Sequence, residues 1–308
     1  MEQDVAGRLE ALSASAVALI GAGRVGGALG IALQQVGLTV VAVASRTRAS
    51  AEALGLRLGL PAMDPQAAAA AASIVFVCTP DDAIEPLVSS LRWTPQQTVL
   101  HCSGASELSV LGAARAQGAA VGGFHPLQLI AQAEQGAASL RGSRVALEAL
   151  PDDATTPALL RGLADALGMG PIQIPPGGRA RYHAAANFAA SGLLSVLDEA
   201  CRLFGSLGVE QDLALSALLP LARGALDAAQ ARGLAGAVSG PVARGDRGVV
   251  ARHMQALGEL GRDSQALYAL LAWRQLALAQ SAGRLSAQQL EQMAALLSSV
   301  APNGASSP

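Results

Sequence analysis

The sequence is poor in aromatic and basic side chains. Tryptophan, tyrosine and phenylalanine make up 3% of the 308 residues, so few rings are available to stack on nucleic-acid bases. Lysine and arginine form no run, and the net charge is −2. Because binding to nucleic acid or to anionic lipid needs a basic surface, we expect neither nucleic acid nor a membrane as a partner.

Cysteine and long apolar runs are also scarce. Cys78, Cys102 and Cys201 are too few for a disulfide framework and lack metal-ligand spacing, so no metal is expected. No apolar run reaches the roughly 18 residues that a membrane helix needs. The N-terminal stretch MEQDVAGRLEAL lacks the basic segment with which a secretory signal begins. We therefore expect a cytoplasmic protein.

Apolar side chains, by contrast, are abundant. Hydrophobic residues make up 51% of the chain and charged residues 14%, with a mean hydropathy of +0.38. This composition indicates a large buried core and excludes a disordered chain. A chain of 308 residues is long enough for two domains.

A strand-like apolar run, 17–20, ends in a glycine-rich turn with the spacing G-x-G-x-x-G. The first glycine permits a tight turn, the second lets a pyrophosphate approach the backbone, and the third lets the following helix pack closely. A second strand-like run begins at Thr39, so the segment is typical of a βαβ unit that binds a dinucleotide. The alternative is a glycine-rich turn that binds nothing. The residues expected to hold the cofactor here are Gly21, Ala22, Gly23, Arg24, Val25 and Gly26.

The end of the second strand indicates which dinucleotide is bound. NAD sites usually place a carboxylate about 20 residues after the glycine turn, where it binds the ribose hydroxyls. Here Ser45, Arg46 and Thr47 occupy that place, followed by Arg48. A guanidinium and hydroxyls suit a 2′-phosphate, so we expect NADP(H). The alternative is that these arginines are solvated loop residues.

The pattern changes from strands to helices near Pro175. Before it, strand-like runs alternate with helical segments; after it, apolar residues recur only at helical spacing. We predict a Rossmann-type α/β domain over residues 14–175, an all-α domain over 176–300 and a disordered tail over 301–308. The expected strands are 16–20, 39–44, 73–78, 98–101, 119–124, 143–148 and 171–174, and the expected helices of the second domain are 178–207, 210–231, 246–260, 263–282 and 286–299.

Polar residues follow several strands, at the edge where open α/β sheets bind ligands. Thr79 and Pro80 would line the cofactor, whereas the two aspartates after them are expected to cap the next helix. His101 ends one strand and is followed by Ser103, which can contact cofactor and substrate or begin a helix. His125 follows the next strand in the same row. For both histidines a structural role is the alternative.

The helical segment carries further candidates. His183 and Asn187 are four residues apart and so share one face of a helix. An imidazole suits general acid catalysis, in which it protonates a carbonyl oxygen or an imine nitrogen as hydride arrives. The alternative is a histidine satisfied within an interface. In the loop 239–246, Arg244 could hold a substrate carboxylate in a bidentate pair, unless the loop is an ordinary turn between helices.

Six stretches together resemble a known group of proteins: IGAGRVGGALG at 20–30, HCSGA at 101–105, FHPLQ at 124–128, RYHAAA at 181–186, LLPL at 218–221 and SGPVARGD at 239–246. With them the chain resembles bacterial Rossmann-like proteins that carry a C-terminal helical domain of unknown function. It is similar to pyrroline-5-carboxylate reductases, ketopantoate reductases and β-hydroxyacid dehydrogenases. The resemblance implies a nicotinamide-dependent reductase whose helical domain is like the C-terminal domain of 6-phosphogluconate dehydrogenase and often forms a homodimer. It also implies that Ser103 matches a substrate-contacting serine of β-hydroxyacid dehydrogenases, and that His183 stands in place of their lysine.

The residues and the resemblance together predict an NADP(H)-dependent oxidoreductase that reduces a small keto or imino acid, with ketopantoate as a candidate. His183 would be the acid, Ser103 and Asn187 would orient the substrate, and Arg244 would hold its carboxylate; His101 and His125 stay open as alternative acids. The alternative function is a non-catalytic NADP-binding sensor or interaction protein. Leucine and alanine on the faces of the second domain predict a homodimer seam or, alternatively, an intramolecular core.

Overall fold

The computed structural model describes residue 12 and residues 14–298. The chain divides into two compact units, one up to Ser191 and one from Gly192. The first unit contains the sheet, and the described part of the second is helical. The predicted tail, 301–308, and nearly all of the leading segment, 1–13, lie outside the described residues.

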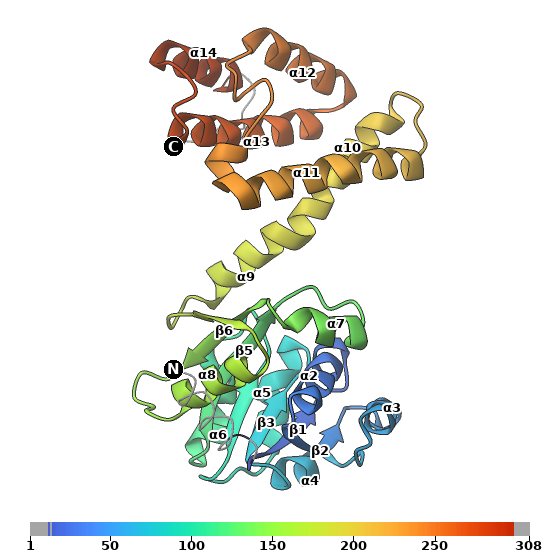
Figure 1. Ribbon diagram of the computed structural model, residues 1–308, viewed down its shortest axis with the longest axis vertical. Helices are drawn as coiled ribbons and strands as arrows, with labels where there is room; N and C mark the ends of the chain where they lie inside the picture. The colour runs from blue at the N-terminus through green and yellow to red at the C-terminus, as the bar shows by residue number, and fades with distance from the viewer. Residues whose placement is uncertain (1–11, 13, 299–308) are drawn as a thin grey trace. The chain divides into compact units, whose positions relative to one another are not determined.

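The first unit is built on a seven-stranded sheet in the order β2-β1-β3-β4-β5-β6-β7 (Figure 1). Neighbouring strands are parallel except for β5 and β6, which pair antiparallel. The parallel strands β1 to β4 begin and end together, so their carboxyl ends form one edge. The strands are β1 Ala16–Ile20, β2 Thr39–Ala44, β3 Ile74–Val77, β4 Thr98–His101, β5 Ala120–Leu127, β6 Arg144–Ala149 and β7 Gly170–Gln173.

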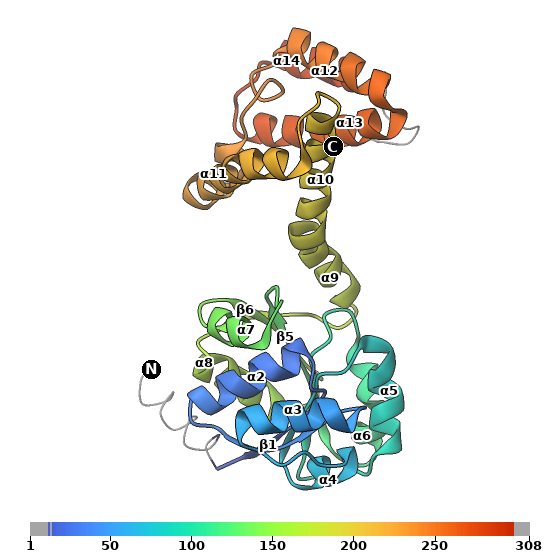
Figure 2. The ribbon, with the colours of Figure 1, turned by 90° about the vertical axis from the view of Figure 1, so that its right-hand side faces the viewer.

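Helices cover both faces of this sheet because each strand presents apolar side chains to both sides. On one face Phe76 and Phe124 meet edge to face at 5.6 Å between ring centres, within a core that includes residues of α2, α3, α7 and α8. On the other face, valines of β3, β4 and β5 pack against α4, α5 and α6, and Figure 2 shows α5 on the side of the sheet away from α2. The helices of this unit are α2 Arg24–Gln35, α3 Arg48–Leu58, α4 Pro65–Ala70, α5 Asp81–Ser90, α6 Gly112–Ala116, α7 Ala133–Leu140, α8 Thr156–Ala166 and α9 Arg179–Asn187, with a 3₁₀ turn at Leu108–Leu111.

The expected strand 119–124 is in fact longer and includes His125 and Pro126. The cause is β6, which pairs antiparallel with β5 as far as Leu127 opposite Arg144. β4 pairs with β5 only as far as Gly123, so at Pro126, which lacks an N–H, β5 has β6 as a partner and β4 no longer pairs with it. His125 therefore lies inside β5, and not after it as the sequence predicts.

The chain passes from the first unit to the second within a π-helical turn, Phe188–Gly192. In the second unit, α12, α13 and α14 share a core formed by Val250, Met254, Leu276 and Met293 among others. α11 bends at Gly233, whose φ of 70° is left-handed and outside the helical range. The helices of the second unit are α10 Leu193–Gly205, α11 Gln211–Ala237, α12 Arg247–Leu260, α13 Arg262–Ser281 and α14 Ala287–Ser298.

Candidate active site

The turn that follows β1 is held by two glycines and left open by a third. A Cβ added at Gly21, whose φ is 121°, would lie 2.5 Å from the carbonyl carbon of Cys78, and one at Gly26 would collide with the carbonyl oxygen of Gly21. A Cβ at Gly23 would meet nothing within 4 Å. The turn therefore has no room for a side chain at Gly21 or Gly26, whereas its backbone is accessible at Gly23, as a site for a pyrophosphate requires.

The N-terminus of α2 lies directly behind this turn. Gly23 is its N-cap and makes no side-chain cap, and the first turn of the helix contains no acidic residue. Its free N–H groups and the positive end of the helix dipole therefore favour an anion at this point.

The basic segment after β2 lies beside the same turn. The backbone N–H of Gly21 donates to the carbonyl of Ala44, the last residue of β2, at 2.8 Å. Arg48 is engaged by Glu52 at 2.7 Å, and the Thr47 hydroxyl accepts the N–H of Ser50 as the cap of α3. Among the described residues Arg46 is exposed and has no side-chain partner, so its guanidinium is available to a ligand.

The segment after β3 completes this edge. The Thr79 hydroxyl is buried and has no hydrogen-bond partner among the described residues. Such a group is unfavourable unless a ligand or water satisfies it. The expected capping by aspartates is wrong in detail, because Pro80 is the N-cap of α5 and makes no side-chain cap. Asp81 and Asp82 lie in the first turn of α5, where their negative charges interact favourably with the positive end of the helix dipole.

A second group of side chains gathers where β4 and β5 meet α9. His125 Nδ1 shares a 2.7 Å hydrogen bond with the hydroxyl of Tyr182, and the rings of His125 and His183 lie 6.5 Å apart. A Cβ added at Gly104 would lie 2.7 Å from His183 Cδ2 and 3.0 Å from His125 Nε2. Both imidazoles therefore occupy space that any other residue at position 104 would take.

A buried ion pair joins the start of α9 to β6. Arg179 Nε donates to Glu148 at 2.6 Å, and the side chains are 0% and 2% exposed. Arg179 also donates from Nη1 to the carbonyl of Ser103 at 3.1 Å, while Glu107 accepts the backbone N–H groups of Gly177 and Arg179. These bonds tie the start of α9 to the loop after β4.

The environment keeps two of the histidines neutral. Burial, followed by the charge of Arg179, lowers the pKa of His101 to about 3. The same two causes lower the pKa of His125 to about 4, with a smaller contribution from His183. His101 Nδ1 accepts the N–H of Ser103, so its proton is on Nε2, which has no partner among the described residues. Burial raises the pKa of Tyr182 to about 12.

The predicted site residues divide between the two units. Ser103 and His183 lie in the group around Gly104, but the Ser103 hydroxyl already accepts the N–H groups of Ala105 and Ser106. Asn187 ends α9 and is exposed. Arg244 lies in the second unit, in the loop that the Asp246 cap of α12 follows, and its guanidinium has no partner among the described residues. Their catalytic roles remain predictions.

Sequence reasoning missed Arg179, Glu148 and Glu107. Their partners are 31 to 76 residues away along the chain, so no local spacing reveals them. One signal was present: Glu148 follows the apolar residues 145–147 of β6, and a charged residue in such a run often implies a buried partner.

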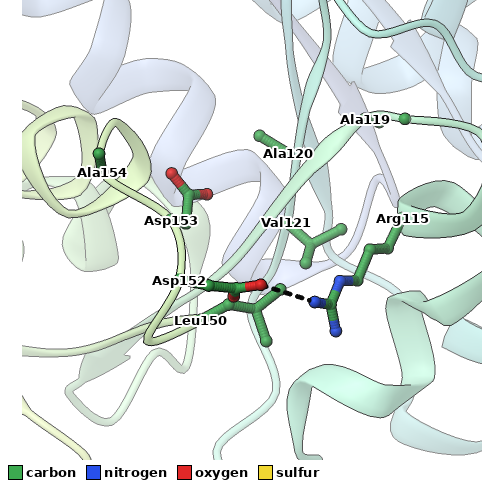
Figure 3. A pocket seen from close by; sticks show the side chains of 9 residues that line it. Arg115, Ala119, Ala120, Val121, Leu150, Asp152, Asp153 and Ala154 are labelled. Carbon is green, nitrogen blue, oxygen red and sulfur yellow. Dashed lines mark hydrogen bonds and ion pairs between the residues drawn. The ribbon is translucent and has the colours of Figure 1, made fainter.

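A separate pocket of about 320 Å³ lies at the opposite end of β5 (Figure 3). Arg115 and Asp152 form an exposed ion pair across it at 3.1 Å. Asp153 also lines it, but its carboxylate is bonded to Thr155 and Thr156. The charged groups that line this pocket are thus paired within the protein. The pocket also lies away from the carboxyl ends of the strands, where the two groups of residues described above are found.

The described residues contain neither a metal-binding group nor a membrane-spanning helix. No group of three or more His, Cys, Asp or Glu side chains is placed to hold a metal ion. No helix is both long and apolar enough to cross a membrane.

Two family models match the chain, one in its N-terminal part and one in its C-terminal part. Residues 3–126 match a Rossmann-like domain, and residues 143–275 match the domain of unknown function DUF2520. The predicted combination of a Rossmann-like domain with a helical domain of unknown function is therefore confirmed. No curated protein sequence matches the chain.

Solved structures share the fold at low sequence identity. The Thermotoga maritima protein TM1727 is 20% identical with a TM-score of 0.70, over 86% of this chain and 98% of its own. A reductive aminase from Aspergillus terreus, solved with NADPH and ethyl-5-oxohexanoate, is 19% identical with a TM-score of 0.58, over 92% and 93%. A 1-pyrroline-5-carboxylate reductase from Streptococcus pyogenes is 14% identical with a TM-score of 0.58, over 88% and 99%.

Proposed function

We propose that this chain, which pairs a Rossmann-like domain with a DUF2520 domain, is an NADP(H)-dependent oxidoreductase that reduces the C=O or C=N bond of a small keto or imino acid. The observation that carries the proposal is the turn after β1, where Gly23 leaves the backbone open at the N-terminus of α2. A reductive aminase of similar fold was solved with NADPH, which supports the choice of cofactor.

The residues around the turn fit a phosphorylated dinucleotide. The N–H groups of α2 would bind the pyrophosphate, and Arg46, with Ser45 beside it, would bind the 2′-phosphate. Between β2 and Glu52 the chain contains no carboxylate that would repel this phosphate. The charge of Glu52 itself is paired with that of Arg48. Thr79 and Pro80 would line the adjacent edge.

Bound NADPH supplies a hydride to an electrophilic carbon, and the protein must supply a proton to the neighbouring oxygen or nitrogen. His101 is fully buried and His125 stays neutral above pH 4, so neither is a charged donor at neutral pH. His183 is exposed beside them, and we assign it the role of acid. In the same proposal Asn187 and Ser103 orient the substrate and Arg244 binds its carboxylate.

Replacing Arg46 with alanine tests the 2′-phosphate contact. A charge-assisted contact of this kind is worth about 1.5–3 kcal/mol, so we expect the Kd for NADPH to rise about 10-fold to 100-fold. NADH lacks the phosphate and should bind equally well to both proteins. Arg48→Ala is the matched control, because that guanidinium is held by Glu52. Equal NADPH affinity in all three proteins, measured by isothermal titration calorimetry, would contradict the assignment.

Replacing Gly23 with alanine tests the pyrophosphate contact. The new methyl has free space in the protein, so the melting temperature should stay unchanged, while the Kd for NADPH should rise about tenfold or more because the methyl occupies the approach to the backbone. Gly112→Ala, whose Cβ also meets nothing within 4 Å, is the control and should change neither quantity. A Gly23→Ala protein that binds NADPH normally would exclude this turn as the phosphate site.

Turnover separates the enzyme from its alternative, a non-catalytic NADP-binding sensor. A panel of keto acids and cyclic imines, followed by NADPH absorbance, should reveal a substrate whose kcat falls in His183→Asn with NADPH affinity unchanged. Binding of NADPH without turnover across the panel would favour the sensor.

We also propose a homodimer through the helical domain. Leucines on α10 and α11 are exposed in the single chain, among them Leu194, Leu213, Leu221 and Leu226. Burying them against a second copy would remove this apolar surface from water. Light scattering that gives a monomer mass would exclude the dimer.

A further inference from the structure

Two of the three cysteines lie side by side at the ligand-binding edge of the sheet. Cys78 directly follows β3 and Cys102 directly follows β4, and their Sγ atoms are 3.5 Å apart. The paired residues of the two strands end one position earlier, at Val77 opposite His101. The thiols are therefore in van der Waals contact just past the last paired residues of the two strands, where the Cys102 N–H still donates to the Val77 carbonyl at 3.1 Å.

We propose that Cys78 and Cys102 are an oxidation-sensitive thiol pair that closes to a disulfide. With a hydroperoxide as oxidant, one thiolate attacks the peroxide oxygen and becomes a sulfenic acid as the alcohol leaves. The second thiol then attacks that sulfur, forming the S–S bond and releasing water. The two thiols lose two electrons and two protons, and the peroxide is reduced to an alcohol and water.

The surroundings of the two thiols assign the order of the steps. Cys78 is partly exposed, so a small peroxide can reach it, whereas Cys102 is buried. The hydrogen bond with Cys78, followed by burial, raises the pKa of Cys102, which makes it the poorer first nucleophile. Cys78 therefore reacts first and Cys102 resolves the sulfenic acid. To form the bond the sulfur atoms must approach from 3.5 Å to about 2.05 Å.

This movement would act on the glycine turn. The carbonyl of Cys78 is packed so closely on Gly21 that a Cβ there would lie 2.5 Å from it, and a Cβ at Gly26 would lie 3.3 Å from the Cys78 Cβ. A shift of Cys78 toward Cys102 changes the support of both glycines. Resting on the proposed function, we infer that oxidation weakens NADPH binding and that reduction restores it.

The disulfide is tested on the full chain without reference to any cofactor. The protein is treated with hydrogen peroxide or tert-butyl hydroperoxide, and intact mass and peptide mapping are measured under non-reducing conditions. We expect a loss of two hydrogens and a linked pair of peptides containing residues 78 and 102. Cys201→Ser, a change in the second unit, should behave like the wild type.

Cys78→Ser and Cys102→Ser should form no internal disulfide, and Cys102→Ser should accumulate sulfenic or sulfinic acid on Cys78. Circular dichroism of both variants checks that they are folded. Wild-type protein in which both thiols stay free, or in which Cys78 is over-oxidised without linking to Cys102, would overturn the proposal.

The effect on NADPH is measured separately. Oxidised wild-type protein should bind NADPH about tenfold more weakly than reduced protein, with full recovery after dithiothreitol, and Cys102→Ala should show no such disulfide-dependent, reversible change. If the reduced protein does not bind NADPH but the disulfide forms, the proposed function fails and the thiol pair stands. If both redox forms bind NADPH equally, the coupling to the glycine turn is wrong.

Discussion

Replacing Arg179 with methionine is expected to lower the free energy of unfolding by about 3–5 kcal/mol, the usual cost of removing one partner from a buried ion pair. The carboxylate of Glu148, which is 2% exposed, would then be buried without its counter-charge. The backbone carbonyl of Ser103 would lose its partner as well. Denaturant unfolding followed by circular dichroism measures the change.

The exposed ion pair between Arg115 and Asp152 provides the matched control. Arg115→Met removes the same type of side chain from a solvated pair and should cost about 0–1 kcal/mol. The double variant Arg179→Met/Glu148→Leu should be more stable than Arg179→Met alone, because it leaves no unpaired charge. A single Arg179→Met variant that is as stable as the control would show that this pair does not support the fold.

Acid is expected to destabilise the first unit well before its carboxylates titrate. His101 and His125 have native pKa values of about 3 and about 4, below the ordinary value of 6.5. Below pH 6.5 the unfolded chain therefore binds protons that the native protein does not. The contribution of the two neutral histidines to the free energy of unfolding is fully present above pH 7 and is lost as the pH drops. For the two histidines together, the free energy of unfolding falls by about 4 kcal/mol between pH 7 and pH 5. Its dependence on pH becomes weaker below about pH 4, where native His125 also binds a proton.

Single histidine variants isolate this effect from other titrations. His101→Asn and His125→Asn should each flatten the dependence of unfolding free energy on pH between 7 and 5. His253→Asn is the control for the substitution itself, because His253 is an exposed residue of α12 in the second unit, where it is hydrogen-bonded to Tyr268. Four charged or titratable groups lie around His125: Arg179, His183, His101 and the hydroxyl of Tyr182. Arg179 is the charge that lowers the pKa of both buried histidines, so Arg179→Met should flatten the slope too. An identical slope in all these proteins would contradict the two low pKa values.

Local patterns predict most of the fold. Neighbouring residues alone predict the strand 16–20, the glycine turn after it and the strand 39–44. This works because a tight turn and a helix N-terminus depend on residues that are close in sequence. The Asp64-Pro65 start of α4 is likewise as expected, with the Asp64 side chain accepting the N–H of Gln66. Sequence reasoning did not find α7, which is short and packs on α2.

The candidate site depends on contacts that no spacing encodes. Glu148 and Arg179 meet only because β6 and the start of α9 are brought to the end of β4. His125 lies inside a strand because of an antiparallel partner, and the sequence carries no sign of that direction. Local chemistry therefore predicts the glycine turn and Arg46 as the cofactor site, whereas the arrangement that sets the protonation of the histidines required the folded chain.

The absence of a side chain at Gly104 has a consequence for relatives of this protein. His125 and His183, which lie 58 residues apart along the chain, both depend on that one position for their space. A lineage that acquires alanine at 104 must move or replace an imidazole, so the three positions should change together. An alignment in which position 104 varies while both histidines persist would indicate that the rings are not held together in those relatives.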